Sequence, residues 1–220
     1  MANWYKSWGK RACDIIAAGS GLILSSPVFL IVAVGLHFAN RGAGVFFRQK
    51  RIGLDNKVFY LIKFKSMNDR RGPDGLPLPD AERLTPLGRL VRSTSLDELP
   101  QLINVLKGDM SLIGPRPLTM DYSHVFSDEH RRRHEVRPGI TGLAQVHGRG
   151  FCKLSRKFAY DVQYVDECSL KMDLGIVMRT IRLVLVREDV GTGDAMMEEI
   201  DDLGFEERMR EYYRTHEYDV

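Results

Sequence analysis

The sequence predicts an α/β (α+β mixed) domain preceded by a re-entrant membrane helix that is broken at Ser26-Pro27. A charge-free apolar run, two aromatic-rich strand patterns and later apolar residues at helical spacing indicate this fold class. We therefore divide the chain into three parts: a membrane segment (1–44), a globular body (45–188) and an acidic C-terminal extension (189–220).

The membrane segment contains the uncharged run from Ile15 to Phe38. At about 1.5 Å per residue, this run could cross a hydrocarbon core about 30 Å thick. Pro27 removes a helix hydrogen bond in its middle, and neighbouring serine hydroxyls can satisfy the freed carbonyls. Lysine and arginine flank both ends, and positive residues mark the cytoplasmic side. Re-entry satisfies both flanks, while a spanning helix and a buried core hairpin remain alternatives.

The net charge of +3 conceals an uneven distribution. Residues 189–220 carry eleven acidic residues against three arginines, a balance of −8, so residues 1–188 carry +11. A basic body favours an anionic partner, such as nucleic acid, acidic lipid headgroups or a phosphorylated substrate. The three cysteines lack metal-ligand spacing and are typical of reduced thiols.

The globular body begins with a predicted β-hairpin, formed by residues 45–51 and 57–65. A proline-rich loop over 68–86 leads into a short helical turn at 87–92. A short strand at 110–113 then ends in the rigid Gly114-Pro115-Arg116-Pro117 turn. Because prolines flank Arg116, we expect its backbone to be preset for binding an anion.

Helices are predicted over residues 122–137, 158–164, 169–187 and 198–214. The first is strongly basic and is expected to rest on anionic headgroups; a metal site at His130 and His134 is a weaker alternative. In the predicted helix 169–187, we expect one apolar face to pack into the core. Its residues are Leu170, Leu174, Val177, Ile181 and Leu185. For the fourth, packing or self-association is expected.

Two adjacent carboxylates, Asp97 and Glu98, stand in the stretch 92–101, with Arg92 before them and Arg116 farther along the chain. One interpretation is structural: Ser95 and Glu98 fit a helix capping box, and Asp97 would complement the helix dipole. Pro100 opposes a helix that begins at Ser95, because it lacks an N–H and restricts the preceding residue. Spacing alone leaves the capping and functional interpretations open.

We expect the regular helix to begin at Pro100, a favoured first position, and to end at Gly108. The two carboxylates would then lie on the approach to its positive end, where phosphates bind readily. The glycine-rich stretch from Arg137 to Gly150 could also bring backbone amides close to a phosphate, although this motif alone is weak.

A series of short motifs runs through residues 8–188 in this order: Lys10-Arg11-x-x-Asp14, Ser26-Pro27, Phe47-Arg48-Gln49, Lys63-Phe64-Lys65-Ser66-Met67, Ser95-Leu96-Asp97-Glu98-Leu99-Pro100-Gln101, Gly108-Asp109-Met110-Ser111, Gly114-Pro115-Arg116-Pro117, Arg137-Pro138-Gly139-Ile140-Thr141-Gly142 and Asp161-x-x-Tyr164. Together, these motifs resemble the bacterial sugar transferase family, in particular the small monotopic phosphoglycosyl transferases of the PglC type. The acidic extension lies outside this resemblance.

The resemblance implies a re-entrant helix and a catalytic body on the cytoplasmic leaflet of the bacterial inner membrane. Family members move a sugar-1-phosphate from a UDP-sugar to polyprenyl phosphate with Mg²⁺. By this match Asp97 is the nucleophile and Glu98 helps to hold Mg²⁺. The remaining implied site residues are the phosphate-binding Arg92, Arg116, Arg137 and Arg149, and the site-lining Asp173.

The resemblance implies no nucleic-acid partner and is compatible with a homodimer, but the sequence does not specify the sugar or the oligomeric state. A binding protein is the alternative: a membrane-anchored adaptor whose basic face holds anionic lipid or nucleic acid. The adjacent Asp97 and Glu98 distinguish the two, because carboxylates beside a phosphate clamp do not help a pure anion binder.

Overall fold

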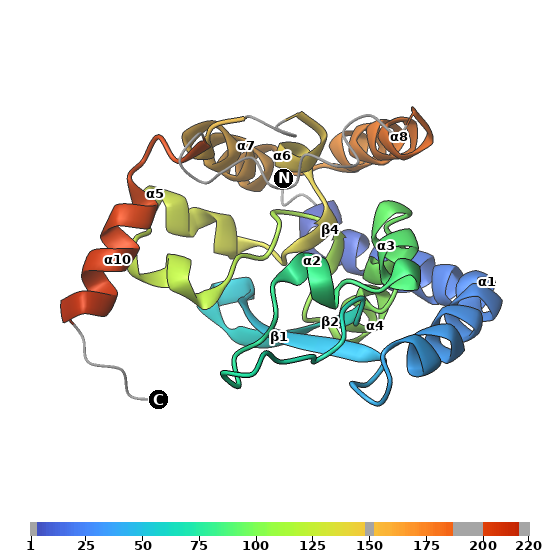
Figure 1. The fold of residues 1–220 in the computed structure, drawn as a ribbon. Helices are drawn as coiled ribbons and strands as arrows, with labels where there is room; N and C mark the ends of the chain where they lie inside the picture. The colour runs from blue at the N-terminus through green and yellow to red at the C-terminus, as the bar shows by residue number, and fades with distance from the viewer. Residues whose placement is uncertain (1–3, 148–151, 187–199, 216–220) are drawn as a thin grey trace.

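The computed structural model describes residues 4–147, 152–186 and 200–215, and Figure 1 shows the arrangement of their elements. Helices α6, α7 and α8 lie along one side of the molecule, and the hairpin β1–β2 lies on the other. The helices and strands are α1 (Lys10–Ala39), β1 (Phe46–Ile52), β2 (Val58–Phe64), α2 (Asp80–Arg83), α3 (Pro86–Ser93), α4 (Gln101–Lys107), β3 (Ser111–Ile113), α5 (Asp128–Arg131), β4 (Gly139–Thr141), α6 (Leu143–His147), α7 (Leu154–Glu167), α8 (Leu170–Val186) and α10 (Phe205–Thr215). Short π or 3₁₀ turns are η1 (Tyr5–Gly9), η2 (Leu54–Asn56), η3 (Leu96–Glu98), η4 (Met120–His124) and η5 (Arg132–Glu135).

Helix α1 contains Pro27 and is bent rather than interrupted, which corrects the predicted break. Figure 1 shows it running outward and turning back about half-way. The carbonyl of Ile23 is the one that Pro27 cannot bind, and the Ser26 hydroxyl donates to it at 2.8 Å. A neighbouring serine thus satisfies the freed carbonyl, as the sequence predicted.

Both ends of α1 are held by the globular body. Near its start, Asp14 Oδ1 accepts a hydrogen bond from the Leu112 amide at 3.1 Å. After its end, Asn40 Nδ2 donates to the Lys65 carbonyl at 2.7 Å. A straight helix of this length would separate its ends by about 45 Å, so the bend is what brings them back to one body.

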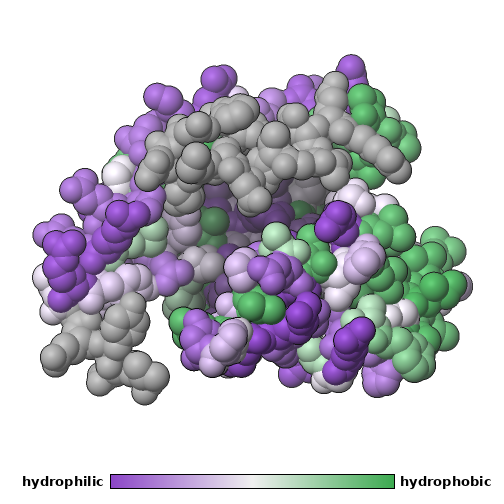
Figure 2. Space-filling model, viewed as in Figure 1, coloured by the Kyte–Doolittle hydropathy of each residue, from purple (hydrophilic) through white to green (hydrophobic). Residues whose placement is uncertain are grey.

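The middle of α1 is apolar and exposed. Residues Tyr5–Ala39 form a helix long and apolar enough to cross a membrane, and little of it is buried inside the protein. Figure 2 shows this hydrophobic surface gathered at one end of the molecule. Its largest exposed side chains include Ile16, Ile23, Leu24, Leu30, Ile31 and Phe38. Because exposed apolar area of this size is unfavourable in water, the surface indicates membrane association.

The predicted hairpin is confirmed, with β1 antiparallel to β2 and Phe46 paired with Phe64. Phe59 and Leu61 point toward α4, where they pack with Val105 and Met110. The 68–86 segment is largely loop, with the single turn α2 within it. The predicted strand before Gly114 is β3, and it pairs in parallel with β4.

The segment 122–137 is not the single basic helix that we predicted. It consists of short turns, α5 and η5, and its basic side chains are paired within the protein. Arg133 is buried against Asp161, and Arg132 is paired with Glu129, Glu135 and Asp166. These arginines are therefore not free to rest on headgroups.

Helix α8 also differs from the prediction, because most of its proposed core face is exposed. Ile176 is buried and Val177 packs beside it, on a neighbouring face of the helix. Leu174, Ile181 and Leu185 remain exposed together with Met178, so helical periodicity located an apolar stripe but not its environment.

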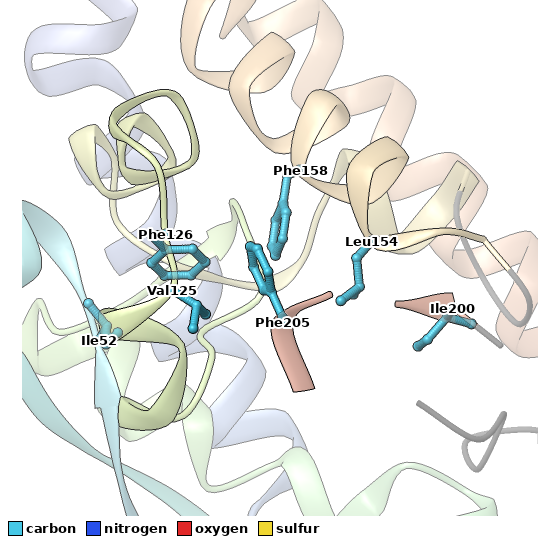
Figure 3. Packing of buried hydrophobic residues seen from close by; sticks show 7 residues of the cluster. All are labelled: Ile52, Val125, Phe126, Leu154, Phe158, Ile200 and Phe205. Atoms are coloured by element: carbon cyan, nitrogen blue, oxygen red, sulfur yellow. The ribbon is translucent and has the colours of Figure 1, made fainter. Parts of the chain in front are cut away.

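The described part of the C-terminal extension, residues 200–215, packs onto the body, as the packing interpretation predicted. Ile200 and Phe205 enter a cluster with Phe126 and Phe158, and Figure 3 shows the side chains of these three phenylalanines gathered together. Phe205 is fully buried. The sequence pattern located the amphipathic helix but did not identify this phenylalanine as its main anchor.

Candidate active site

The two adjacent carboxylates lie in a single turn, η3, between α3 and α4. Ser95 enters this turn with φ of 56°, a left-handed conformation that separates η3 from α3. Its side chain makes no capping hydrogen bond, which removes the capping-box interpretation. The backbone conformation at this turn therefore fixes the two acids, without a side-chain cap.

The next helix largely follows the prediction. Regular α4 begins at Gln101, with Pro100 as its cap, and it ends at Gly108 in the left-handed conformation. Leu99 is helical, with φ of −51° and ψ of −41°, so the proline did not exclude it from the α region as expected. The 3₁₀ geometry of η3 accommodates the proline by ending before it.

A lysine and an arginine converge on these carboxylates. Lys63 Nζ lies 2.7 Å from Glu98 Oε1 and 3.5 Å from Asp97 Oδ2. Arg116 Nη2 lies 3.1 Å from the same Glu98 oxygen. The side chains of Asp97 and Glu98 are 15% and 21% exposed, whereas that of Arg116 is 52% exposed. The cluster is thus recessed but open to a substrate.

The surroundings of the two acids shift their pKa values in opposite directions. Burial raises the pKa of Asp97 above its usual value, and the nearby Glu98 adds to this rise, while Lys63 opposes it. Burial would also raise the pKa of Glu98, but Arg116 and Lys63 outweigh it and lower that pKa to about 2. Glu98 is therefore a fixed anion at neutral pH, and Asp97 is the less stabilised carboxylate.

Two of the four predicted arginines reach this cluster. Arg116 contacts Glu98 directly, and Arg92, exposed in the last turn of α3, acts on Asp97 through its charge. Arg137 instead donates from Nε to the Gly108 carbonyl at 2.9 Å, at the far end of α4. Arg149 lies outside the described residues.

Asp173 is placed in a different, buried network. Its carboxylate accepts hydrogen bonds from the hydroxyls of Tyr5 and Tyr164 and pairs with Lys10 at 2.9 Å. None of its recorded contacts within the described part of the chain is with Asp97 or Glu98. The structure therefore shows Asp173 anchoring the start of α1 to α7 and α8.

Comparison with known proteins gives a consistent family. The model of the bacterial sugar transferase family matches residues 5–187. The chain is 49% identical over 181 residues to the uncharacterized sugar transferase EpsL of Bacillus subtilis, covering 82% of this chain and 89% of the relative. The chain belongs to the bacterial sugar transferase family.

Two further relatives carry descriptive names. A UDP-glucose:undecaprenyl-phosphate glucose-1-phosphate transferase of Caulobacter vibrioides is 39% identical over 190 residues, covering 82% of this chain and 71% of the relative. The exopolysaccharide production protein ExoY of Rhizobium meliloti is 36% identical over 192 residues, covering 80% and 84%. Residues 200–215 of this sugar transferase lie outside the family match.

Lys63 is the site residue whose role sequence reasoning missed. It belongs to one of the motifs that carried the resemblance, but no function was assigned to it. A signal was present in the strand: positions 59, 61 and 63 share one face of β2, and the first two are buried apolar residues. A lysine that continues an inward-facing apolar row needs an anionic partner, and here it has two.

The side chains at this site of the sugar transferase offer ligand atoms that suit Mg²⁺. Among the described residues, no three His, Cys, Asp or Glu side chains are grouped to hold a metal ion, so the alternative of a site at His130 and His134 gains no support. Mg²⁺, however, commonly uses one or two carboxylates together with substrate oxygens and water. Lys63 and Arg116 both contact Oε1 of Glu98, and no described residue donates a recorded hydrogen bond to Oε2. Glu98 therefore has an ionised oxygen available for a metal.

Proposed function

We propose that this protein transfers a sugar-1-phosphate from a UDP-sugar to polyprenyl phosphate with release of UMP, through a covalent phosphosugar ester of Asp97. This would be the first membrane step of a bacterial glycoconjugate pathway. The Asp97–Glu98 pair between Lys63, Arg92 and Arg116 carries the proposal. The name of the Caulobacter relative, a UDP-glucose:undecaprenyl-phosphate glucose-1-phosphate transferase, supports the donor and acceptor classes.

In the first half-reaction, Asp97 attacks the phosphorus that bears the sugar. A P–O bond forms to the carboxylate as the P–O bond to UMP breaks, and UMP leaves with the electron pair. In the second, a phosphate oxygen of the polyprenyl phosphate attacks the same phosphorus and the bond to Asp97 breaks. The carboxylate is regenerated, so lipid and nucleotide use one site in turn.

The charges around Asp97 suit this chemistry. Lys63 opposes the burial that would protonate Asp97, and so favours the nucleophilic carboxylate. Arg92 and Arg116 would bind phosphate oxygens, where a guanidinium fork gives both charge and direction. Bound at Glu98, Mg²⁺ would neutralise charge on the diphosphate. Assignment of phosphate contacts to Arg137 and Arg149 rests on the family resemblance alone.

The bent helix supports a re-entrant topology, with the catalytic body on the cytoplasmic leaflet of the inner membrane. Both ends of α1 contact the same body, at Asp14 and at Asn40, while its middle is apolar and exposed. Such a helix would enter and leave the bilayer on one side. Basic residues at both flanks favour the cytoplasmic side.

The adaptor alternative is less well supported by the structure. It requires a free basic face, but Arg133 is paired with Asp161 inside the protein and Arg132 is paired with Asp166 at the surface. The exposed Arg116 contacts Glu98, which adjoins Asp97 in the same turn. An anion binder would be weakened by those carboxylates, whereas a group-transfer enzyme uses one of them as the acceptor.

Intact-protein mass after mixing with a UDP-sugar and Mg²⁺, without lipid, tests the nucleophile. We expect a sugar-phosphate adduct and release of UMP before acceptor is added, and neither with Asp97→Asn. Glu98→Gln should also lose turnover, with partial rescue at high Mg²⁺. A panel of UDP-sugars then identifies the donor. Sequential kinetics and no adduct in an active wild-type enzyme would exclude Asp97 as the nucleophile.

A further inference from the structure

We propose that the C-terminal extension positions Arg116 for catalysis, acting through Phe205 and the buried Arg133. Phe205 lies outside the family match, whereas Arg133 and Arg116 lie inside it, and the inference rests on the proposed phosphate-binding function of Arg116. In this arrangement Arg133 and Phe205 are positioning residues, because neither contacts Asp97 or Glu98 in the recorded interactions of the described chain.

The first step is the contact between Arg133 and the backbone of Arg116. Arg133 Nη2 donates to the Arg116 carbonyl at 2.8 Å. The same guanidinium binds Asp161 Oδ2 through Nε at 3.0 Å and Nη2 at 2.7 Å. Pro115 and Pro117 restrict the backbone on either side. By holding this carbonyl, Arg133 fixes the backbone position from which the Arg116 side chain reaches Glu98.

The second step is the aromatic enclosure of Arg133. Its guanidinium carbon lies 5.8 Å from the ring centre of Phe126 and 5.3 Å from that of Phe158. Arg133 is only 3% exposed, as is its partner Asp161. A charged pair this deeply buried depends on continuous exclusion of water, because solvent weakens both its ion pair and its hydrogen bonds.

The third step is the closure of this enclosure by the extension. The Phe205 ring stacks on Phe158, with centroids 5.6 Å apart, and meets Phe126 nearly edge-on at 6.1 Å. Figure 3 shows Phe205 placed against both rings from the C-terminal segment. Its complete burial means that removing the ring would open a cavity beside the two phenylalanines that enclose Arg133.

A second, independent contact ties the extension to the same region. The Tyr213 hydroxyl donates to Asp121, and the Tyr212 ring stacks on His124 with centroids 3.9 Å apart. Asp121 and His124 belong to η4, which begins at Met120, only three residues after Pro117. The extension thus holds both the partner of the Arg116 carbonyl and the segment that follows Arg116.

A double-mutant cycle between Phe205→Ala and Arg116→Ala tests the inference. With the full-length enzyme in detergent, we measure kcat and KM for the UDP-sugar, and hydrogen exchange of a peptide spanning residues 111–120. Phe205→Ala should lower kcat/KM at least fivefold and speed exchange in that peptide. In the Arg116→Ala background, the same change should lower kcat/KM less than twofold, because the group being positioned is already absent.

Two variants serve as controls. Phe205→Leu keeps an apolar side chain in the enclosure and should restore most of the lost activity; it also keeps the test usable if Phe205→Ala fails to fold. Arg210→Gln changes an exposed ion pair on α10 and should leave rate and exchange as in the wild type.

The outcomes separate this inference from the proposed function. Equal losses from Phe205→Ala with and without Arg116 would overturn the positioning role, as would a folded Phe205→Ala with unchanged rate and exchange. Wild-type turnover in Arg116→Ala alone would instead show that Arg116 does not bind the reacting phosphate.

Discussion

At the scale of single residues, the central feature is that two neighbouring acids have different contacts with nearby cations. Asp97 and Glu98 share one turn, yet Arg116 and Lys63 both contact Glu98 at hydrogen-bond distance, while Lys63 is farther from Asp97. The two adjacent residues therefore differ in charge stabilisation: Glu98 is ionised at neutral pH, and Asp97 is the carboxylate with less electrostatic stabilisation. The difference arises from which cations each acid meets, not from its residue type.

Replacement of Arg116 by lysine tests whether geometry matters in addition to charge. Lysine keeps the positive charge but lacks the planar fork that binds two oxygens at once. We expect kcat/KM of Arg116→Lys to fall about tenfold or more, corresponding to roughly 1.4 kcal/mol, with an unchanged thermal midpoint. Near-wild-type turnover would show that the residue serves only the turn.

His134 gives the fold a measurable dependence on pH. Burial lowers its pKa to about 4, helped by Arg133 and Arg131, and its Nδ1 hydrogen-bonds to Asn56 at 2.7 Å. The unfolded chain would bind a proton at a pKa near 6.5, so stability is complete above that pH and falls as the pH drops toward 4. The loss is up to about 3 kcal/mol.

Thermal midpoints measured across this pH range check the prediction, with His134→Gln as the matched variant. The variant should be less stable than the wild type at pH 7.5 and should lose less stability on acidification. An identical pH dependence for the two proteins would assign the effect to other groups.

At the scale of elements, α1 shows how one proline changes the course of a helix without ending it. The Ser26 hydroxyl donates a hydrogen bond to the Ile23 carbonyl, which Pro27 leaves without its helical partner. The bend therefore does not leave this carbonyl unsatisfied in an apolar environment. Small residues let the returning helix lie close to the body: a side chain added at Gly35 would meet Leu87 at 2.8 Å.

Labelling of introduced cysteines tests the topology of α1. In a variant without Cys13 and Cys152, we introduce Ser7→Cys before the helix or Lys57→Cys after it, both at exposed positions. Because both flanks should be cytoplasmic, we expect impermeant thiol reagents to label each only after the cells are opened. Labelling of just one site in intact spheroplasts would establish a spanning helix.

At the scale of the whole molecule, buried polar groups join segments that are far apart in sequence. Asp173 links Tyr5 and Lys10 at the start of the chain to Tyr164 on α7, and the Tyr164 hydroxyl also lies 3.1 Å from the Ile113 carbonyl oxygen. This network connects the membrane segment to the strand that leads into the Gly114–Pro117 turn.

Asp173→Asn should therefore destabilise the molecule as a whole. It leaves the Lys10 charge without its closest carboxylate in a largely buried position, a change that typically costs about 3 kcal/mol or more. We expect a lower thermal midpoint and faster hydrogen exchange over residues 4–14. An unchanged midpoint would show that the network does not anchor α1, and would return Asp173 to consideration as a site residue.

Local signals in the sequence determined much of this protein: the apolar run with its proline, the β1–β2 hairpin, the Asp97–Glu98 pair and the family resemblance. These depend on periodicity, turn chemistry and residue type, which act over a few neighbouring positions. Only the tertiary structure decided that Arg133 and Asp173 are buried, that the stripe on α8 is exposed, and that Lys63 joins the site. Burial and charge pairing depend on which distant segments meet, so the same arginine or leucine can face solvent or core. For that reason the route between Phe205 and Arg116, which are separated by 89 positions, became visible only in the tertiary structure. There Phe205 belongs to the buried cluster beside Arg133, and Arg133 holds the Arg116 carbonyl.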